Sequence, residues 1–408
     1  MPHVEGFRCV VCGAEYGLDQ VTYVCPACGP VGVLDVVYAY DRIPAARPDG
    51  GARSMWYRQL APLSAEAQLP ALNIGGTPLY DAPRLAGMLG LARVWVKDDG
   101  RNPTASFKDR ASAMVVAHAL ELGISTVATA STGNAAAALA GVCAATPGIS
   151  ATIFVPAAAP EAKIAQLLVY GARVLLVEGT YDDAFDLCWD VCEEFGWYNR
   201  STGINPFTTE GKKTVSFELA EQLGWRTPDV VVVSVGDGSI IGGVHKGFVD
   251  MLAMGWIERI PRLIGVQAEG SSPLVEAWQH GLTAQEMKPV DAHTIADSIS
   301  SGLPRDRAKA LRAVRETGGA FVRVSDDQII QAIPELAQAT GVFAEPAGAA
   351  AYAGLKQAVA EGWVRSSESV AVLVTGSGLK DIRSAMKSVG SVVRVAPSLE
   401  AVRVVVNR

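Results

Sequence analysis

The sequence predicts an α/β protein with mostly parallel sheets that carry helices on both faces. Seven short runs rich in β-branched residues are apolar almost throughout and end at Gly, Ser or Asp, as strands buried on both faces do. Helical stretches alternate with these runs, which is the pattern of parallel sheets. The chain has 408 residues, which is enough for two to three domains and a sizeable core.

The expected elements follow one another without an internal repeat or a long low-complexity linker. The seven expected strands lie at 93–99, 125–131, 150–156, 173–179, 229–238, 262–270 and 369–378. The helices expected between them include Phe107–Leu122, Tyr181–Phe195, Gly242–Met254 and Asp327–Thr340. Loops at the carboxyl ends of parallel strands usually carry the functional residues, so we expect the active side chains at those ends.

The composition excludes several classes of protein. Hydrophobic residues make up 49% of the chain and charged residues 19%, which argues against disorder. A net charge of -7 leaves no basic excess for a phosphate backbone, so we expect no nucleic-acid partner. The sequence has neither a run of 18 apolar residues nor a signal-peptide pattern. We therefore expect a soluble, cytoplasmic protein with no membrane partner.

Four of the seven cysteines form two C-x2-C pairs that are 12 residues apart. Each pair turns two sulfurs toward one point, and two pairs can place four thiolates around one zinc ion. The predicted zinc ligands are Cys9, Cys12, Cys25 and Cys28. Because four ligands leave no open position, we expect a structural site; a redox role or a metal-free ribbon is the alternative. We expect burial as small hydrophobic residues for Cys143, Cys188 and Cys192.

The loop NPTASFKDR places a lysine at the start of a helix. Asn102-Pro103 predicts a turn, and Lys108 falls in the first turn of the helix that follows. An ammonium group there faces the positive end of the helix dipole, so its amine is easier to deprotonate. This suits a lysine that forms a Schiff base. The alternative is a solvated lysine paired with Asp109 or Asp98.

The loop ASTGN, residues 130–134, opens an Ala-rich helix. Free N–H groups and hydroxyls at a helix start make a site for a carboxylate or a phosphate. An ordinary N-cap by Ser131 or Thr132 explains the same residues. Both interpretations stay open at the level of the sequence.

Two glycine-rich loops follow the strands at 229–238 and 369–378. In the first loop, Gly236, Gly238 and Ser239 let the backbone approach an anion, although a tight turn alone is the alternative. The pattern is neither G-x-G-x-x-G nor a P-loop. In the second loop, Thr375 stands among glycines that admit a flat ring. An amine, an anion cradle and a polar slot at the strand ends of one sheet together indicate a pyridoxal phosphate site.

At these loops the sequence resembles the threonine synthases, which are fold type II (tryptophan synthase β-like) pyridoxal phosphate enzymes. The resemblance covers nearly the whole chain, and its blocks occur in family order. The blocks are GGTPL at 75–79, NPTASFKDR around Lys108, ASTGN around Asn134, YGARVLLVEGTYDDA, NPFTTEGKKT, FAEPAGAA around Glu345 and TGSGLKD. The Cys-rich N-terminal stretch is similar to an extension on many archaeal and bacterial members.

The resemblance implies two open, mostly parallel α/β domains and a small N-terminal zinc ribbon. We expect the ribbon at 1–40, a large cofactor-binding domain at 41–115 and 213–408, and a small substrate-gripping domain at 116–212. The resemblance also implies pyridoxal 5'-phosphate as the cofactor, and the family's habit is a homodimer.

The resemblance assigns roles residue by residue. Lys108 matches the lysine that bonds covalently to the cofactor and moves protons, and Phe107 matches the neighbour beside the cofactor. Asn134 matches the side chain that hydrogen-bonds the phenolic oxygen of the cofactor, and Thr375 matches the partner of the pyridine nitrogen. The expected grip on the substrate carboxylate comprises Ser131, Thr132 and Gly133. The expected cofactor-phosphate loop comprises Gly236, Asp237, Gly238, Ser239 and Ile240.

The implied reaction converts O-phospho-L-homoserine and water into L-threonine and phosphate. The phosphate of such a substrate is a dianion, which needs cationic or hydroxyl donors from the small domain. The candidate donors are Lys163, Asn205, Thr208 and Thr209.

One loop departs from the family pattern. Threonine synthases often have G-N-x-G-N where this chain has GDGSI, which looks nearer to threonine and serine dehydratases. Asp237 would repel a phosphate unless it is turned away or paired, for example with Lys246. The alternative function is therefore a paralogue on the same fold: a threonine or serine dehydratase, or a β-replacement enzyme such as cysteate synthase. An inactive relative is disfavoured because Lys108 is intact.

Overall fold

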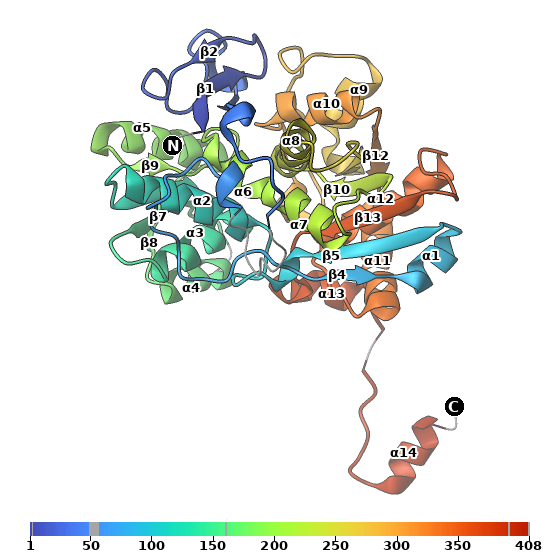
Figure 1. Cartoon of the computed structure of the whole chain (residues 1–408). Helices are drawn as coiled ribbons and strands as arrows, with labels where there is room; N and C mark the ends of the chain where they lie inside the picture. Colours follow the sequence, from blue (N-terminus) through green and yellow to red (C-terminus); the bar gives the residue numbers. More distant parts are fainter. Residues whose placement is uncertain (2, 49–56, 160, 391, 407–408) are drawn as a thin grey trace.

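The computed structural model describes residues 1, 3–48, 57–159, 161–390 and 392–406. The chain forms three sheets, and helices surround the two larger ones (Figure 1). Among the described residues, every helix is too short or too polar to cross a membrane.

The large sheet has six strands in the order β12-β11-β10-β13-β5-β4. Neighbouring strands run parallel except for β4, which pairs antiparallel with β5 at one edge. The strands are β4 (Leu79–Asp81), β5 (Arg93–Asp98), β10 (Val230–Ser234), β11 (Arg262–Ala268), β12 (Ala320–Val324) and β13 (Ser369–Val374).

Alternate residues of the central strands pack into two cores, one on each face of the large sheet. Val231 and Val233 of β10 join the first core, and Val230 and Val232 join the second. The first core takes in α2 (Lys108–Glu121), α7 (Thr214–Gln222), α8 (Ser239–Ala253) and α10 (Arg307–Glu316). The second takes in α1 (Pro83–Leu89), α11 (Asp326–Thr340) and α12 (Pro346–Ala360). The predicted burial of parallel strands on both faces is confirmed.

The smaller sheet has four parallel strands in the order β8-β7-β6-β9. Its elements are β6 (Thr126–Ala130), α3 (Asn134–Ala144), β7 (Ser150–Pro156), α4 (Glu161–Val169), β8 (Arg173–Val177), α5 (Tyr181–Phe195) and β9 (Tyr198–Asn199). α6 (Phe207–Lys212) contacts both α2 and α8. α2 and α6 therefore join the part of the chain around the large sheet to the part around the smaller sheet. The expected domain boundaries near residues 115 and 212 stay predictions.

The predicted elements are present, with ends that differ from expectation by no more than four residues. Short or mixed strands such as β9 and β12 were not expected, since a run of two to five residues gives little periodic signal. Three helices complete the described chain: α9 (Pro273–Gln279), α13 (Ile382–Lys387) and α14 (Leu399–Val406). α14 has no buried residue and stands apart from the body of the molecule (Figure 1).

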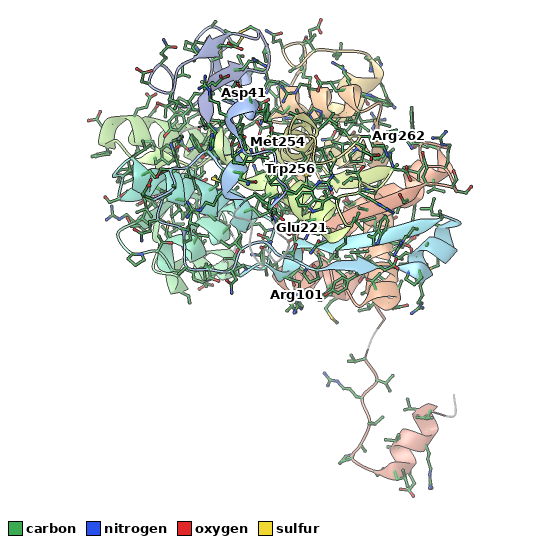
Figure 2. The ribbon with its side chains drawn as sticks, in the orientation of Figure 1. Asp41, Arg101, Glu221, Met254, Trp256 and Arg262 are labelled. Atoms are coloured by element: carbon green, nitrogen blue, oxygen red, sulfur yellow. The ribbon has the colours of Figure 1, made fainter. Side chains whose placement is uncertain are left out.

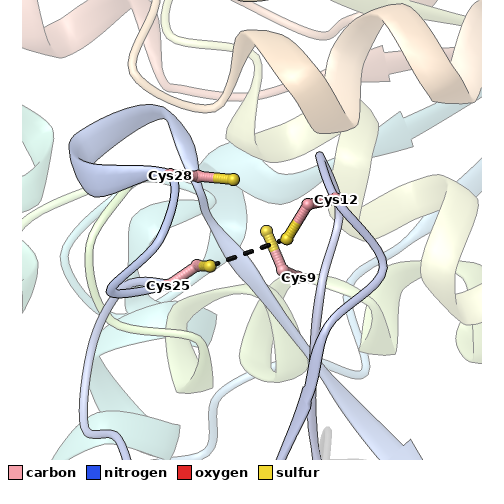
Figure 3. A group of neighbouring side chains, drawn as sticks. All are labelled: Cys9, Cys12, Cys25 and Cys28. Carbon is pink, nitrogen blue, oxygen red and sulfur yellow. Dashed lines mark hydrogen bonds between the residues drawn. The ribbon is translucent and has the colours of Figure 1, made fainter.

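The N-terminal ribbon is an antiparallel sheet in the order β2-β1-β3. Its strands are β1 (Val4–Cys9), β2 (Glu15–Tyr16) and β3 (Leu34–Tyr38). The second cysteine pair lies in the turn before β3, where a Cβ on Gly32 would come within 2.7 Å of the Cβ atoms of Cys25 and Cys28. The turn therefore needs a glycine so that both cysteines can face the first pair (Figure 3).

The four cysteine sulfurs of the ribbon fit a zinc ion. They lie within 4.8 Å of one another, and the Sγ atoms of Cys12 and Cys25 are 3.7 Å apart (Figure 3). Thiolates about 2.3 Å from one tetrahedral zinc lie about 3.8 Å from each other. None of the four is in a disulfide, and Cys143, Cys188 and Cys192 are buried free thiols, as predicted.

The segment that follows the ribbon is fastened to the large domain by polar contacts. Tyr57 Oη donates to Glu221 Oε2 over 2.5 Å, and Trp256 Nε1 donates to the carbonyl of Ala45 over 3.0 Å. Glu221 and Trp256 lie in the middle of the molecule in Figure 2. The ribbon is thus part of the body and not a separate module on a free linker.

Replacing both Cys9 and Cys12 with Ser is expected to abolish zinc binding and to unfold the ribbon. An arm of about 40 residues has too little core to fold without a metal staple. Metal analysis and thermal unfolding of the purified variant measure both effects. The Cys188→Ala, Cys192→Ala double variant is the matched control and should keep its zinc. Full zinc content in the Cys9, Cys12 variant would contradict the ligand assignment.

Candidate active site

A cavity of about 570 Å³ lies where the loops at the carboxyl ends of the strands meet. All four loops singled out in the sequence contribute to its wall. The lining includes Lys108, Ser131, Thr132, Gly133, Asn134, Gly236, Asp237, Gly238, Ser239, Ile240, Glu345 and Thr375. The structure therefore brings together the predicted amine, the predicted carboxylate grip and the predicted phosphate loop.

Lys108 is the first residue of α2, as the sequence predicted. The loop before it is joined to the loop after β13, because Phe107 N donates to Thr375 O over 2.9 Å and Ser377 N donates to Ala105 O over 3.0 Å. Ala105 adopts a left-handed conformation with φ +63°. A non-glycine residue there is strained, which is common where surrounding contacts hold a functional loop.

The alternative of a solvated lysine paired with Asp109 or Asp98 is wrong. Asp109 is buried and accepts from the backbone N–H of Thr104 over 2.7 Å and from the Thr104 hydroxyl. Asp98 accepts from Gly100 N over 3.1 Å. Both carboxylates thus shape the loop in front of Lys108.

A buried network of ion pairs holds the first turn of α2 in position. The Arg110 guanidinium, with no exposed surface, contacts Asp99 Oδ2 at 2.6 Å and Glu218 Oε1 at 2.5 Å. Glu218 also contacts Lys97 Nζ at 2.7 Å. Since Arg110 lies two residues beyond Lys108, this network sets where the lysine enters the cavity.

Burial lowers the pKa of Lys108 to about 8. The Arg200 guanidinium lowers the pKa further, while the carboxylates of Asp237 and Glu345 oppose the shift. A large fraction of Lys108 is therefore neutral near pH 8, which suits an amine that acts as nucleophile and base. Burial, and not the helix start that the sequence suggested, is the main cause of the lowered pKa of Lys108.

The ASTGN loop leaves its hydroxyls available to a ligand. α3 begins at Asn134 with Gly133 as its N-cap, and no side chain caps the helix. The expected alternative, an N-cap by Ser131 or Thr132, is therefore wrong. Ser131 Oγ accepts from Gly133 N over 3.2 Å, which folds the loop around the helix start. Such a helix start suits an anion such as a carboxylate.

Glu345 is a site residue that the sequence analysis included in a block without a role. Asn134 Nδ2 donates to Glu345 Oε1 over 2.7 Å, and a Cβ on Gly376 would lie 2.2 Å from the same oxygen. Burial raises the pKa of Glu345 to about 7, and Lys380 and Asn134 oppose the shift. The signal in the sequence was a Glu-Pro pair at a helix start, directly before α12.

The glycine loop at the start of α8 forms a cradle with little free space. A Cβ on Gly236 would lie 2.8 Å from Ile299 Cα, and one on Gly238, at φ +89°, would lie 2.8 Å from Ala310 Cβ. The Ser239 hydroxyl donates to Asp306 Oδ2. Ser234 Oγ also lines the cavity and has no hydrogen-bond partner in the described part of the chain.

Asp237 is held by the loop at residues 300–305. Its Oδ1 accepts from Ser301 Oγ over 3.0 Å and from Arg305 N over 3.3 Å. The expected pairing with Lys246 is wrong, because Lys246 pairs with Asp250 one helical turn along α8. Donors from the 300–305 loop thus satisfy the carboxylate beside the predicted phosphate loop.

Four predicted site residues are not among the described residues that line the cavity: Phe107, Asn205, Thr208 and Thr209. The Phe107 ring is fully buried in the core. The side chain of Lys163 lies outside the described residues.

Asn205 and Thr208 are used by a local turn. Asn205 Nδ2 donates to Asn199 O over 2.9 Å, and its Oδ1 accepts from Phe207 N over 2.9 Å. Thr208 Oγ1 donates to Asn205 O over 2.8 Å. Because both side chains are buried and occupied, this geometry contradicts the prediction that they contact the substrate phosphate.

Two buried basic side chains, which are not themselves among the residues that line the cavity, were missed by the sequence analysis. Arg200 donates through Nη1 to Thr202 Oγ1 over 3.4 Å, and Thr202 lines the cavity. Arg200 Nη2 and Lys212 Nζ have no hydrogen-bond partner among the described residues. Burial holds the pKa of Lys212 well below its usual range; Asp306 opposes this, while Lys108, Arg200 and Lys309 repel the charge. Cations crowded in this way favour an anion.

Residues 71–376 match the family described as pyridoxal-phosphate dependent enzyme. A threonine synthase of Methanosarcina acetivorans is 40% identical over 97% of this chain and 97% of its own length. A threonine synthase of Methanocaldococcus jannaschii is 38% identical over 93% of this chain and 94% of its own. The structure of threonine deaminase isoform 2 from Solanum lycopersicum, 23% identical, matches with a TM-score of 0.63 over 76% of this chain and 86% of that one. The chain therefore has the fold type II architecture and belongs to the pyridoxal-phosphate-dependent enzymes, and within them to the threonine synthases.

Proposed function

We propose that the chain converts O-phospho-L-homoserine and water into L-threonine and phosphate. Its relatives over nearly the whole length are threonine synthases. The single observation that carries the proposal is the pair of buried basic side chains, Arg200 and Lys212, whose Nη2 and Nζ atoms have no hydrogen-bond partner among the described residues. A phosphorylated amino acid supplies the negative charge that these cations lack, whereas an unphosphorylated amino acid does not.

The residues present fit pyridoxal 5'-phosphate, which is the family's cofactor. Lys108 would hold its aldehyde carbon, and the loop Gly236–Ile240 would hold its phosphate with backbone N–H groups at the start of α8. The loop has no room for a side chain at Gly236 or Gly238, since a Cβ there would lie 2.8 Å from Ile299 Cα or from Ala310 Cβ. Asn134 and Thr375 would bind the ring oxygen and the ring nitrogen. Thr375 would offer the ring nitrogen a neutral hydroxyl, whereas an Asp would offer a charged carboxylate.

When bound, the cofactor supplies an electron sink for carbanions formed next to the substrate amine. Lys108 Nζ removes the proton from Cα and then a proton from Cβ, and phosphate leaves from Cγ as its C–O bond breaks. One proton returns to Cγ before water adds its hydroxyl at Cβ, and a second proton then returns to Cα. The lowered pKa of Lys108 keeps enough neutral amine for these steps. Because one amine serves several steps, its loss costs more than the loss of any binding group.

The ASTGN loop would orient the substrate carboxylate. Ser131, Thr132 and Gly133 line the cavity at the start of α3, and Asn134 beside them is fixed by Glu345. A carboxylate held there would share one cavity with the amine of Lys108. Holding the substrate in this way makes proton transfer to Lys108 effectively unimolecular.

The substrate phosphate would be balanced by Arg200 and Lys212 in place of Asn205 and Thr208. Burial lowers the pKa of Arg200 to about 10, so its guanidinium stays charged at neutral pH. Lys212 gains a proton when a dianion arrives, because the dianion offsets the repulsion from its three cationic neighbours. Binding of the phosphate is therefore linked to proton uptake.

Several expectations about the whole protein stay predictions. These are the structural role of zinc in the ribbon, the division at 1–40, 41–115 with 213–408, and 116–212, the homodimer and the cytoplasmic location.

One assay tests the proposed function against the dehydratase and β-replacement alternatives. Purified enzyme receives phosphohomoserine, phosphoserine with sulfite, threonine and serine in turn, and phosphate and keto acid are measured. We expect phosphate and threonine from phosphohomoserine, and no turnover in Lys108→Ala. Release of 2-oxobutyrate from threonine, without phosphate from phosphohomoserine, would overturn the proposal in favour of a dehydratase.

Lys212→Met is expected to raise KM for phosphohomoserine by about tenfold or more, because it removes a buried cation that balances the dianion. Steady-state kinetics measure KM, and inhibition by unphosphorylated threonine should change little, since threonine carries no phosphate.

The matched control is Lys288→Met, the same chemical change at an exposed lysine. It should leave both constants as they are. Equal weakening of phosphohomoserine and threonine binding in Lys212→Met would show that Lys212 supports the fold and not the phosphate.

A further inference from the structure

Asp35 is an acidic residue of the ribbon that reaches into the large domain. It lies on β3, and its side chain is 12% exposed. Its Oδ1 lies 3.2 Å from Lys309 Nζ, and its Oδ2 accepts from Arg312 Nη2 over 2.5 Å. Both cations belong to α10, so one carboxylate of the ribbon holds two residues of one helix.

Lys309 is the buried end of this contact. Its side chain is 2% exposed, and its Nζ also donates to Leu34 O and to Thr209 Oγ1, each over 2.8 Å. Among the described residues, Asp35 is thus the one carboxylate that forms an ion pair with Lys309. The stem of Lys309 packs on α8, where a Cβ on Gly242 would lie 2.7 Å from Lys309 Cβ.

The N-terminal end of α10 carries the glycine loop. Asp306, the N-cap of α10, accepts from the Ser239 hydroxyl, and its backbone N–H donates to Asp237 O over 2.8 Å. Ala310 faces Gly238, where a Cβ would lie 2.8 Å from Ala310 Cβ. The loop Gly236–Ile240 therefore takes its position from the first turn of α10.

We infer that Asp35 is a positioning residue for the cofactor phosphate, acting through Lys309 and α10 on the glycine loop. The inference rests on the assignment of Gly236–Ile240 to the cofactor phosphate under the proposed function. This inference gives the ribbon a role beyond its own folding. Asp35 of β3 supplies the negative charge that keeps the buried ammonium group of Lys309 in its position on α10.

The physical reason is the behaviour of a buried ion pair that loses one partner. An unpaired charge in the interior is strongly unfavourable, so the helix that carries it shifts or the charge is lost. Among the described residues, Lys309 without Asp35 keeps two neutral hydrogen-bond acceptors, Leu34 O and Thr209 Oγ1. A shift of α10 reaches the glycine loop directly through Asp306 and Ala310.

The test is cofactor binding by apoenzyme of the full chain, with pyridoxal 5'-phosphate and phosphate-free pyridoxal as probes. Asp35→Asn is expected to weaken binding of pyridoxal 5'-phosphate by about tenfold or more, with a much smaller change for pyridoxal. A purely structural role would weaken both probes alike. No amino-acid substrate is present, so failure of the proposed reaction would leave this result unaffected.

Two further variants make the outcome decisive. Arg8→Gln removes an exposed ion pair with Glu15 in the same ribbon and should bind both probes as wild type does. The double variant Asp35→Asn, Lys309→Met removes both charges of the ion pair. It should bind pyridoxal 5'-phosphate more tightly than Asp35→Asn alone, and it should still bind if Asp35→Asn alone fails to fold. Wild-type affinity in Asp35→Asn, parallel loss of both probes, or no recovery in the double variant would each overturn the inference.

Discussion

The contact between the first turn of α10 and the glycine loop at the start of α8 is the constraint on which the rest of the site depends. Gly238 has a left-handed backbone and touches Ala310 so closely that no side chain fits between them. The Ser239 hydroxyl is committed to Asp306. The loop is therefore held in one conformation before any ligand arrives, and its residues line the same cavity as Lys108 of α2.

Buried charge is arranged around this constraint in two ways. Beneath α2, Arg110 is balanced by Asp99 and Glu218, so that network fixes a position and leaves no net demand for a ligand. Beside the cavity, Arg200 and Lys212 have unpartnered nitrogens among the described residues. An unbalanced buried cation costs stability, and proteins retain such features mainly at sites that bind something. The balanced network around Arg110 therefore supports the fold, whereas the unbalanced side chains of Arg200 and Lys212 indicate a binding site.

The sequence predicted the parts of the fold and site that depend on local pattern. Apolar β-branched runs marked the strands, and four polar loops at their ends marked the cavity, because carboxyl ends of parallel strands gather at one edge. It failed where the role of a residue depends on distant neighbours. Asn205 and Thr208 were predicted as phosphate donors because the resemblance implies donors from the small domain, yet a local turn uses them. Lys212 lies in the run GKKT and gives no sign of burial, and Asp35 gives no sign of its partners 270 residues away.

Phosphorus-31 NMR of the holoenzyme tests the central claim, that the glycine loop holds the cofactor phosphate as a dianion, most directly. A free phosphate monoester takes up its second proton at a pKa of about 6, so its resonance moves across that pH range. We predict that the resonance of the bound cofactor phosphate keeps one position from about pH 6 to about pH 8, because the backbone N–H groups of the loop favour the dianion. A resonance that titrates like the free cofactor would show an exposed phosphate and contradict the account.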